Sequence, residues 1–524
     1  MQPGTPQGPN PVQAPVAMAQ TPMMNIPQGM TLVTPEPVPL SPAPSNLQMA
    51  RPSRPWRMYG RIVGLVVLLY IFEESIASGW ILALEGESLY GSICMIFAIP
   101  TMLAIVAIRR PRVILLERAV PDSSGQQLHT ITSQAGSLQT QIPTRLDRHL
   151  IRDNSILDVP ASSTAWWIFA ATVVCAIGLS IMLALDIAFL LAGILIIPTV
   201  LVGFSIPVMG WWSHSTKRIG LPTRRRDAEA WLMAGMLSGL PAIMINSWLF
   251  PGIITTILPN ISEDNLFYLA VMISAPVGEE ICKAIAIWFF ASRIRSPKHG
   301  FQVGFTVGLG FAIIENLTYI AESSVGVLFS ATILIRGIGS IPGHAFWTGL
   351  TGAAMGWTIM RTRAASMQLA AEAGHQIKAP EKEESDWKLV DKDTGAILET
   401  PQSTTGGVTV GPSGVQIWVP TQEIITKKPW LTVPLPEKIV FGLLLAMLGH
   451  ATWNGAGILL FLVAVDLDMS MFVYVILELF LTVLLVAGVL IIGSGLLHSV
   501  RLAPDGSEVD EYQAQLAQLT QQRL

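Results

Sequence analysis

Residues 265–291 read NLFYLAVMISAPVGEEICKAIAIWFFA, an apolar run that is interrupted near its middle by Glu279, Glu280 and Lys283. A helix of this length crosses about 30 Å of hydrocarbon, so the run predicts a membrane span. Charged side chains at that depth cost about 3 kcal/mol or more each and are usually functional. Lys283 follows Glu279 by four residues and Glu280 by three, so on a helix it faces both carboxylates.

Apolar runs of similar length lie on both sides of this one. Hydrophobic residues make up 51% of the 524 and charged residues only 13%, against about 25% charged in soluble domains. The backbone of such runs has no water to bond with in lipid, so each must be a helix. The sequence therefore predicts an all-α polytopic membrane protein with about ten spanning helices, near 62–84, 88–108, 165–184, 187–210, 230–250, 265–291, 301–321, 327–360, 437–463 and 471–497.

Basic residues cluster on one side of this ten-helix count. The clusters precede the first helix or follow the second, fourth, sixth and eighth, and they contain Arg51, Arg54, Arg57, Arg61, Arg109, Arg110, Arg112, Lys217, Arg218, Arg224, Arg225, Arg226, Arg293, Arg295, Lys298, Arg361 and Arg363. Positive residues favour the cytoplasmic side, so both termini are expected in the cytoplasm of a multi-pass cell-membrane protein. The lipid bilayer is then its environment. The net charge of −4 gives no sign of nucleic-acid binding.

Polar segments divide the chain into regions. Residues 1–55 are rich in Pro and Gln and predict a disordered tail. Residues 56–228 form a four-helix membrane region with a cytoplasmic loop at 109–163, and residues 229–500 form a second membrane domain. A cytoplasmic insertion at 361–436 interrupts that domain and is expected to contain a small β-hairpin, and residues 501–524 form a polar C-terminal tail. The three cysteines all lie in apolar runs, which excludes a disulfide framework and a thiolate zinc site.

Three other polar positions or pairs fall at similar depth in neighbouring spans. Glu315 and Asn316 lie in the seventh helix, and His344 lies in the eighth, just after a stretch of Gly and Pro that predicts a kink. His450 and Asn454 are four residues apart in the ninth helix, so they share one face. A single histidine or asparagine is often a structural link between helices, but the full set at one depth favours a catalytic site.

The motifs Glu279-Glu280-x-x-Lys283 and Phe311-Ala-x-x-Glu315-Asn316, followed by the histidine motifs, resemble the PrsW family of intramembrane proteases. This family is close to the CAAX-processing and bacteriocin-immunity membrane proteases. In the CAAX group the first motif ends in Arg at a longer spacing, and the second carries His where this chain has Glu315, so CAAX specificity is not expected here. The resemblance covers about residues 230–497 and implies that membrane-anchored proteins are the substrates.

The residues suggest a mechanism for peptide hydrolysis. Glu280 or Glu279 is expected to be the general base, with Lys283 holding the pair in position. His450, with Asn454 beside it, is expected to donate to the oxyanion or to the leaving amine. Asn316 belongs to the same catalytic set.

Glu315 and His344 are expected to orient water or, with His450, to bind a metal such as Zn²⁺. The sequence contains no His-Glu-x-x-His helix, and related families are argued to use glutamate without a metal. Both a metal-dependent and a glutamate mechanism therefore stay open.

Two other classes of protein remain as alternatives. Proton-coupled transporters also carry mid-membrane carboxylates and histidines, and Glu73, Glu74 and Arg336 fit that pattern. No internal repeat supports a transporter, however, and Arg336 is interpreted as a side chain that extends toward the membrane surface. A non-catalytic membrane scaffold or immunity factor is the second alternative.

Overall fold

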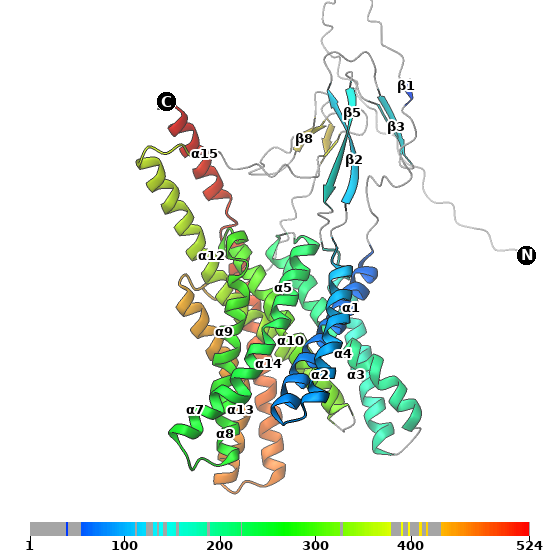
Figure 1. Cartoon of the computed structure of the whole chain (residues 1–524), viewed down its shortest axis with the longest axis vertical. Helices are drawn as coiled ribbons and strands as arrows, with labels where there is room; N and C mark the ends of the chain where they lie inside the picture. Colours follow the sequence, from blue (N-terminus) through cyan, green and yellow to red (C-terminus); the bar gives the residue numbers. More distant parts are fainter. Residues whose placement is uncertain are drawn as a thin grey trace, which may run out of the picture. The chain divides into compact units, whose positions relative to one another are not determined.

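The computed structural model describes residues 54–110, 157–185, 189–221, 223–324, 328–378 and 431–522, together with the backbone of nine short strands between residues 38 and 417. Figure 1 shows the helices as one bundle. The chain divides into two compact units, of which the larger comprises residues 46–116, 150–386 and 418–524 and contains every helix. Most of the expected disordered tail, 1–55, lies outside the described residues.

The helices of the larger unit follow the apolar runs of the sequence. They are α1 (Pro55–Leu84), α2 (Ser88–Ile108), α3 (Ser162–Ala184), α4 (Phe189–Ile219), α5 (Arg225–Leu237), α6 (Gly239–Met244), α7 (Phe250–Ile257), α8 (Glu263–Leu269), α9 (Ala275–Trp288), α10 (Pro297–Ser323), α11 (Phe329–Ile335), α12 (Ile341–Glu372), α13 (Ile439–Asp466), α14 (Met471–Leu502) and α15 (Ser507–Gln522). A 3₁₀ turn, η3 (Ala291–Arg293), follows α9. Three π-helical turns join neighbouring helices: η1 (Ile245–Leu249), η2 (Ala270–Ser274) and η4 (Arg336–Ser340).

The all-helical membrane character is confirmed. Eight helices of the described part are long and apolar enough to cross a membrane, compared with the ten spans predicted. The two predicted spans outside this count are 265–291, which forms α8, η2 and α9, and 327–360, which forms α11, η4 and α12. The first carries three charged residues near its middle, and the second is rich in Gly and Thr. The kink expected in the span 327–360 corresponds to the π turn η4, and the helix continues through it from α11 to α12.

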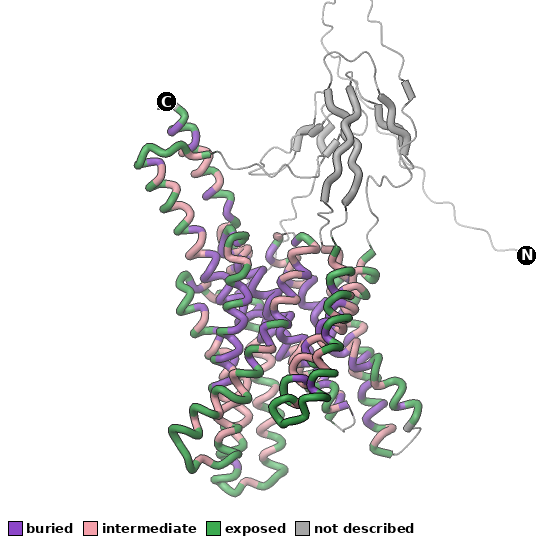
Figure 2. Tube along the Cα trace, in the orientation of Figure 1, coloured by how far each residue is buried: buried purple, intermediate pink, exposed green. Residues whose placement is uncertain are grey.

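Helix α10 lies at the centre of the bundle. In its most apolar stretch 83% of the residues are buried, more than in any other of the eight candidate spans, and Figure 2 shows α10 and the first half of α12 largely buried. Gly300, Gly304 and Gly308 lie one turn apart on α10, and a Cβ at any of them would meet a backbone carbonyl of α12. Small residues at this spacing let two backbones approach closely, as in membrane helix dimers.

Buried polar contacts join the N-terminal helices to the rest. Glu229 of α5 is only 2% exposed, and its Oε1 accepts a hydrogen bond of 2.7 Å from Arg61 of α1. Arg225 and Arg109 lie 3.9 Å from the same carboxylate. A buried acid surrounded by three arginines is compensated, so this group fixes α1 and the end of α2 against α5.

The smaller unit comprises residues 1–45, 117–149 and 387–417, and the strands lie mostly in it. They are β1 (Val38–Pro39), β2 (Val113–Pro121), β3 (His129–Ser133), β4 (Gly136–Gln139), β5 (Thr144–Arg152), β6 (Leu389–Val390), β7 (Ile397–Leu398), β8 (Val408–Val410) and β9 (Val415–Ile417). One sheet has the order β1-β3-β4, and β2-β5, β6-β7 and β8-β9 form pairs. The β6-β7 pair is antiparallel, with Val390 opposite Ile397.

Candidate active site

The polar residues of α9, α10, α12 and α13 meet in the interior of the bundle. Lys283 of α9 is fully buried, and its Nζ is the centre of the group. It donates to Glu280 Oε1 at 2.7 Å and to His344 Nδ1 at 2.9 Å, and lies 3.5 Å from Glu279 Oε2. The ammonium also lies 3.8 Å from the centre of the Phe311 ring. One cation thus holds two carboxylates and a histidine, which compensates their burial.

Glu280 is 1% exposed and both of its oxygens have partners. Besides Lys283, Oε1 accepts from His450 Nδ1 at 3.1 Å, and Oε2 accepts from Thr348 Oγ1 at 3.2 Å. A carboxylate that binds one imidazole nitrogen fixes the tautomer and the ring orientation. Since Nδ1 carries the proton that goes to Glu280, the Nε2 of His450 is left as an acceptor.

Trp347 holds the His450 ring in place. The two rings are stacked, with centroids 5.2 Å apart and an interplanar angle of 16°. Each site histidine follows a glycine, and a Cβ on Gly343 or Gly449 would meet the Trp347 indole. The repeated Gly-His pattern of the sequence is therefore explained by one tryptophan that packs against both positions.

Glu279 differs from its neighbour because one of its oxygens has no hydrogen bond within the described part of the chain. Asn246 Nδ2 donates to Oε1 at 3.4 Å, and Ser274 in turn donates to Asn246 Oδ1 at 2.8 Å. Oε2 has no hydrogen-bond partner in the described part of the chain, and neither has His450 Nε2. These two acceptors face each other at 3.7 Å. Two buried acceptors at that distance require a donor or a cation between them.

A second carboxylate–histidine pair lies beside the first. His344 Nε2 is 2.6 Å from Glu315 Oε2, and the other oxygen of Glu315 accepts from Arg336 at 3.0 Å. Arg336 also lies over the Tyr319 ring, at 3.7 Å from its centre. The interpretation of Arg336 as a side chain extending to the membrane surface is wrong, because the π turn η4 directs it inward to the carboxylate.

The three π turns all adjoin this site. Asn246 lies in η1, Ser274 ends η2, and Arg336 begins η4. A π turn adds one residue to a helix and changes the direction of the side chains that follow, and such turns are frequent at functional sites. Each turn here supplies a side chain that contacts Glu279, its partner Asn246, or Glu315.

A metal ion fits the donor set of the site. Glu279, His344 and His450 are buried, and each offers a ligand atom within 4.8 Å of the other two. Two of the atoms, Glu279 Oε2 and His450 Nε2, have no hydrogen-bond partner among the described residues. Carboxylates also contact the other nitrogen of each histidine, an arrangement typical of metal-binding histidines. The sequence analysis placed Glu315 in the ligand set, whereas in the structure Glu279 completes the compact group and Glu315 contacts His344.

The structure thus brings together most of the residues that the sequence singled out. Asn316 and Asn454 are apart from them: Asn316 donates to Ala312 O on its own helix, and Asn454 Nδ2 lies 3.4 Å from Val271 O in η2. Sequence reasoning missed Asn246 and Thr348. Asn246 is an amide inside an apolar run, which is a usable signal, whereas a threonine in a Gly- and Thr-rich helix gives none.

A polytopic helical bundle with a buried cluster of Glu, His and Lys is consistent with a membrane hydrolase. Residues 228–376 match the model of the PrsW family intramembrane metalloproteases. These residues form a PrsW family intramembrane metalloprotease domain, so this multi-pass membrane protein contains a peptidase domain, and the buried Glu and His cluster is consistent with its active site. The match is shorter than the expected 230–497, so His450 lies outside it. No curated protein matches the chain, and no solved structure does.

Proposed function

We propose that Glu279 and His450 bind and activate the water that attacks the peptide bond. The facing pair of unpartnered acceptors, Glu279 Oε2 and His450 Nε2, is the observation that supports this assignment. A water molecule between them donates one hydrogen to each, which satisfies both atoms. Glu279 is also the more accessible of the two adjacent acids, with a side chain 12% exposed against 0% for Glu280.

The hydrolysis then follows from the positions of the groups. Glu279 takes a proton from the water as its oxygen bonds to the carbonyl carbon of the substrate. The proton taken up by Glu279 passes to His450 Nε2, 3.7 Å away, and from there to the amide nitrogen as the carbon–nitrogen bond breaks, which leaves a carboxyl and an amine terminus and restores Glu279. Glu280 is a positioning residue in this scheme because its oxygens already bind Lys283, His450 and Thr348.

We infer that zinc is the metal when the site is loaded, because two histidines and a carboxylate with an open position are the ligands of catalytic zinc. Glu279, His344 and His450 would hold it. The ion would supply Lewis acidity, which polarises water and carbonyl groups. Glu280 and Glu315 would keep their contacts with His450 and His344, whereas Lys283 would release His344 Nδ1, which it contacts at 2.9 Å.

We further propose that the protein lies in the cell membrane with both termini in the cytoplasm, and that it cleaves membrane-anchored proteins within or beside their spans. The distribution of basic residues supports the orientation. Ten crossings place every basic cluster on one side, and the two additional crossings are the polar segments that carry Glu279 and His344. Lys283 and Arg336 neutralise part of the buried negative charge of these segments.

The test compares wild type with Glu279→Gln at equal levels in the native membrane, by mapping protein N-termini across the membrane proteome. New termini in or beside single-pass segments are expected with wild type only. Glu263→Gln is the matched control, because this exposed acid begins the same helical segment. Termini that persist in Glu279→Gln would remove Glu279 from the mechanism. Their absence from wild type as well would contradict the proteolytic activity in that membrane.

A further inference from the structure

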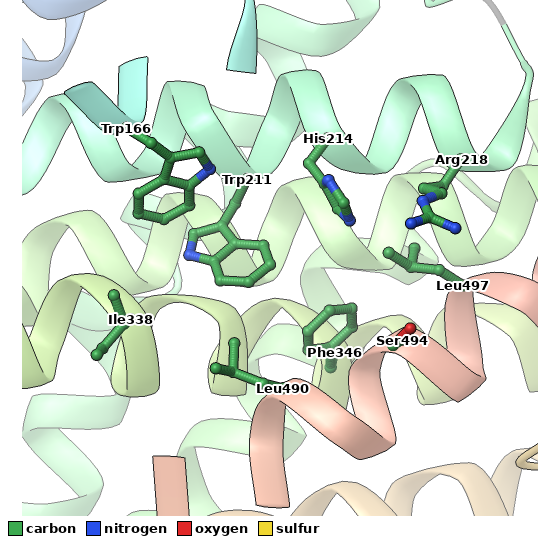
Figure 3. A pocket seen from close by; sticks show the side chains of 9 residues that line it. All are labelled: Trp166, Trp211, His214, Arg218, Ile338, Phe346, Leu490, Ser494 and Leu497. Carbon is green, nitrogen blue, oxygen red and sulfur yellow. The ribbon is translucent and has the colours of Figure 1, made fainter. Parts of the chain in front are cut away.

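A cavity separate from the active site lies between α3, α4, η4, α12 and α14. Its volume is about 390 Å³, within the range of about 300–1,000 Å³ typical of small-molecule sites. Figure 3 shows Trp211, His214 and Arg218 extending from α4 toward Phe346 and Ser494. Nothing in the mechanism uses these side chains.

The lining changes from apolar to cationic along its length. Trp211, His214 and Arg218 lie at successive turns on one face of α4, and Leu490 and Ser494 lie one turn apart on α14. Leu490 and Trp211 form the apolar end, whereas Arg218 lies in the last turn of α4. The helix becomes polar over the same turns, which is the composition expected where a span leaves the hydrocarbon.

Among the described residues, Arg218 has no partner of opposite charge. It is half-buried, and within the described part of the chain no carboxylate pairs with it and no hydrogen bond involves its guanidinium. His214 and Lys217, which precede Arg218 on the same helix, are not acidic and therefore do not neutralise its charge. An arginine fork and a serine hydroxyl that line one cavity match the oxygens of a phosphate ester.

We propose that this cavity binds one anionic phospholipid, with its phosphate at Arg218 and Ser494 and an acyl chain against Trp211 and Leu490. The apolar end of the cavity distinguishes a lipid from a free phosphate ester, which would leave that surface uncovered. A guanidinium facing an apolar cavity at a membrane boundary also favours an anionic headgroup over a zwitterionic one.

The cavity adjoins the π turn that carries Arg336. Ile338 of η4 lines the cavity, and Trp211 Nε1 donates to Gly337 O of the same turn at 3.0 Å. A bound lipid packs against Trp211 and Ile338 and so stabilises η4. Its occupancy therefore supports the Arg336–Glu315 pair, which makes the lipid a structural cofactor of the protease domain.

The test is lipid titration of the purified full chain, followed by native mass spectrometry. The probes are dioleoylphosphatidylglycerol, dioleoylphosphatidylcholine and the deacylated headgroup glycerophosphoglycerol. Arg218→Gln is expected to weaken binding of the first phosphatidylglycerol molecule by about tenfold or more. Lys217→Gln, which removes an exposed charge at the neighbouring position, is expected to stay within about twofold of wild type.

Leu490→Trp fills the apolar end without changing the charge and is expected to weaken binding as well. Wild-type binding by Arg218→Gln, or equal affinity for phosphatidylcholine, would overturn the proposal. Equally tight binding of glycerophosphoglycerol would assign the site to a free phosphate ester instead. Since binding is read directly, the result does not depend on the proposed catalytic roles.

Discussion

Replacing Lys283 by methionine tests whether one buried cation organises the active site. Its Nζ lies 2.7 Å from Glu280, 2.9 Å from His344 and 3.5 Å from Glu279, and the side chain is fully buried. Methionine is similar in length and flexible, so the change removes the charge and the donors while filling most of the space. The change in unfolding free energy then reports mainly the lost electrostatic interactions of Lys283.

The expected cost is about 3–5 kcal/mol of unfolding free energy, because removing one member of a buried ion pair leaves the other charge uncompensated. Two carboxylates lose their partner here, and His344 loses the donor to its Nδ1. Against a total stability of about 5–15 kcal/mol, such a loss is large. We therefore expect Lys283→Met to lower both the folded yield and the peptidase activity.

The assay is unfolding by SDS titration in mixed micelles, applied to Lys283→Met, Glu280→Gln and the double variant. Removing the uncompensated charge of Glu280 is expected to return about 1–3 kcal/mol, so the double variant is more stable than the sum of the two single changes predicts. Lys438→Met, at an exposed position before α13, is the control and should stay within about 0.5 kcal/mol. A cost below about 1 kcal/mol for Lys283→Met, or strict additivity, would refute the reasoning.

Three further changes test other parts of the structure. Gly304→Leu places a side chain against a carbonyl of α12 and is expected to cost about 1–3 kcal/mol or more in thermal unfolding, whereas Gly193→Leu, where nothing lies within 4 Å, is expected to be neutral. Arg336→Met is expected to lower activity by about 10–100-fold, as for a lost supporting contact, with partial recovery in Arg336→Lys; unchanged activity would contradict its role. His450→Ala is expected to abolish near-stoichiometric zinc measured after dialysis, whereas His498→Ala, on α14, is expected to retain it. Equal zinc in both histidine variants would exclude His450 as a ligand.

The sequence was sufficient to single out the residues that meet at the centre of the buried cluster. Charged and imidazole side chains are rare in apolar runs, so Glu279, Glu280, Lys283 and His344 are conspicuous without any structure. Helical spacing also predicted the contact of Lys283 with both acids, which the structure confirms at 3.5 and 2.7 Å. Local geometry on one helix follows from its period alone.

The sequence could not predict whether Glu279 or Glu280 has an oxygen without a hydrogen-bond partner. That difference depends on Thr348 and His450, which come from helices 68 and 170 residues away from Glu280, and on Asn246, 33 residues before Glu279. Sequence spacing contains no information on how these helices rotate against one another. The close approach of α10 and α12 could not be predicted for the same reason. In the sequence, Gly300, Gly304 and Gly308 of α10 only interrupt an apolar pattern and do not indicate which helix packs against them.

The position of Arg336 was not predicted from the sequence. It was interpreted as a side chain that extends toward the membrane surface, whereas in the structure it begins the π turn η4 and pairs with Glu315. The Gly and Pro residues nearby indicated an irregularity, which the sequence analysis took for a kink. The Gly and Pro content of a segment indicates that its helix is irregular there, but it does not specify a π turn.

These π turns also connect the family domain to helices outside it. A π turn leaves a backbone carbonyl without its regular partner, and in lipid that carbonyl must be satisfied by protein. In η4 the indole of Trp211 on α4 donates to Gly337 O, and in η2 the amide of Asn454 on α13 lies 3.4 Å from Val271 O. Both donors lie outside residues 228–376. The irregular turns that adjoin the candidate site are therefore stabilised by helices beyond the matched segment, and that segment alone does not contain the complete cluster of buried polar residues.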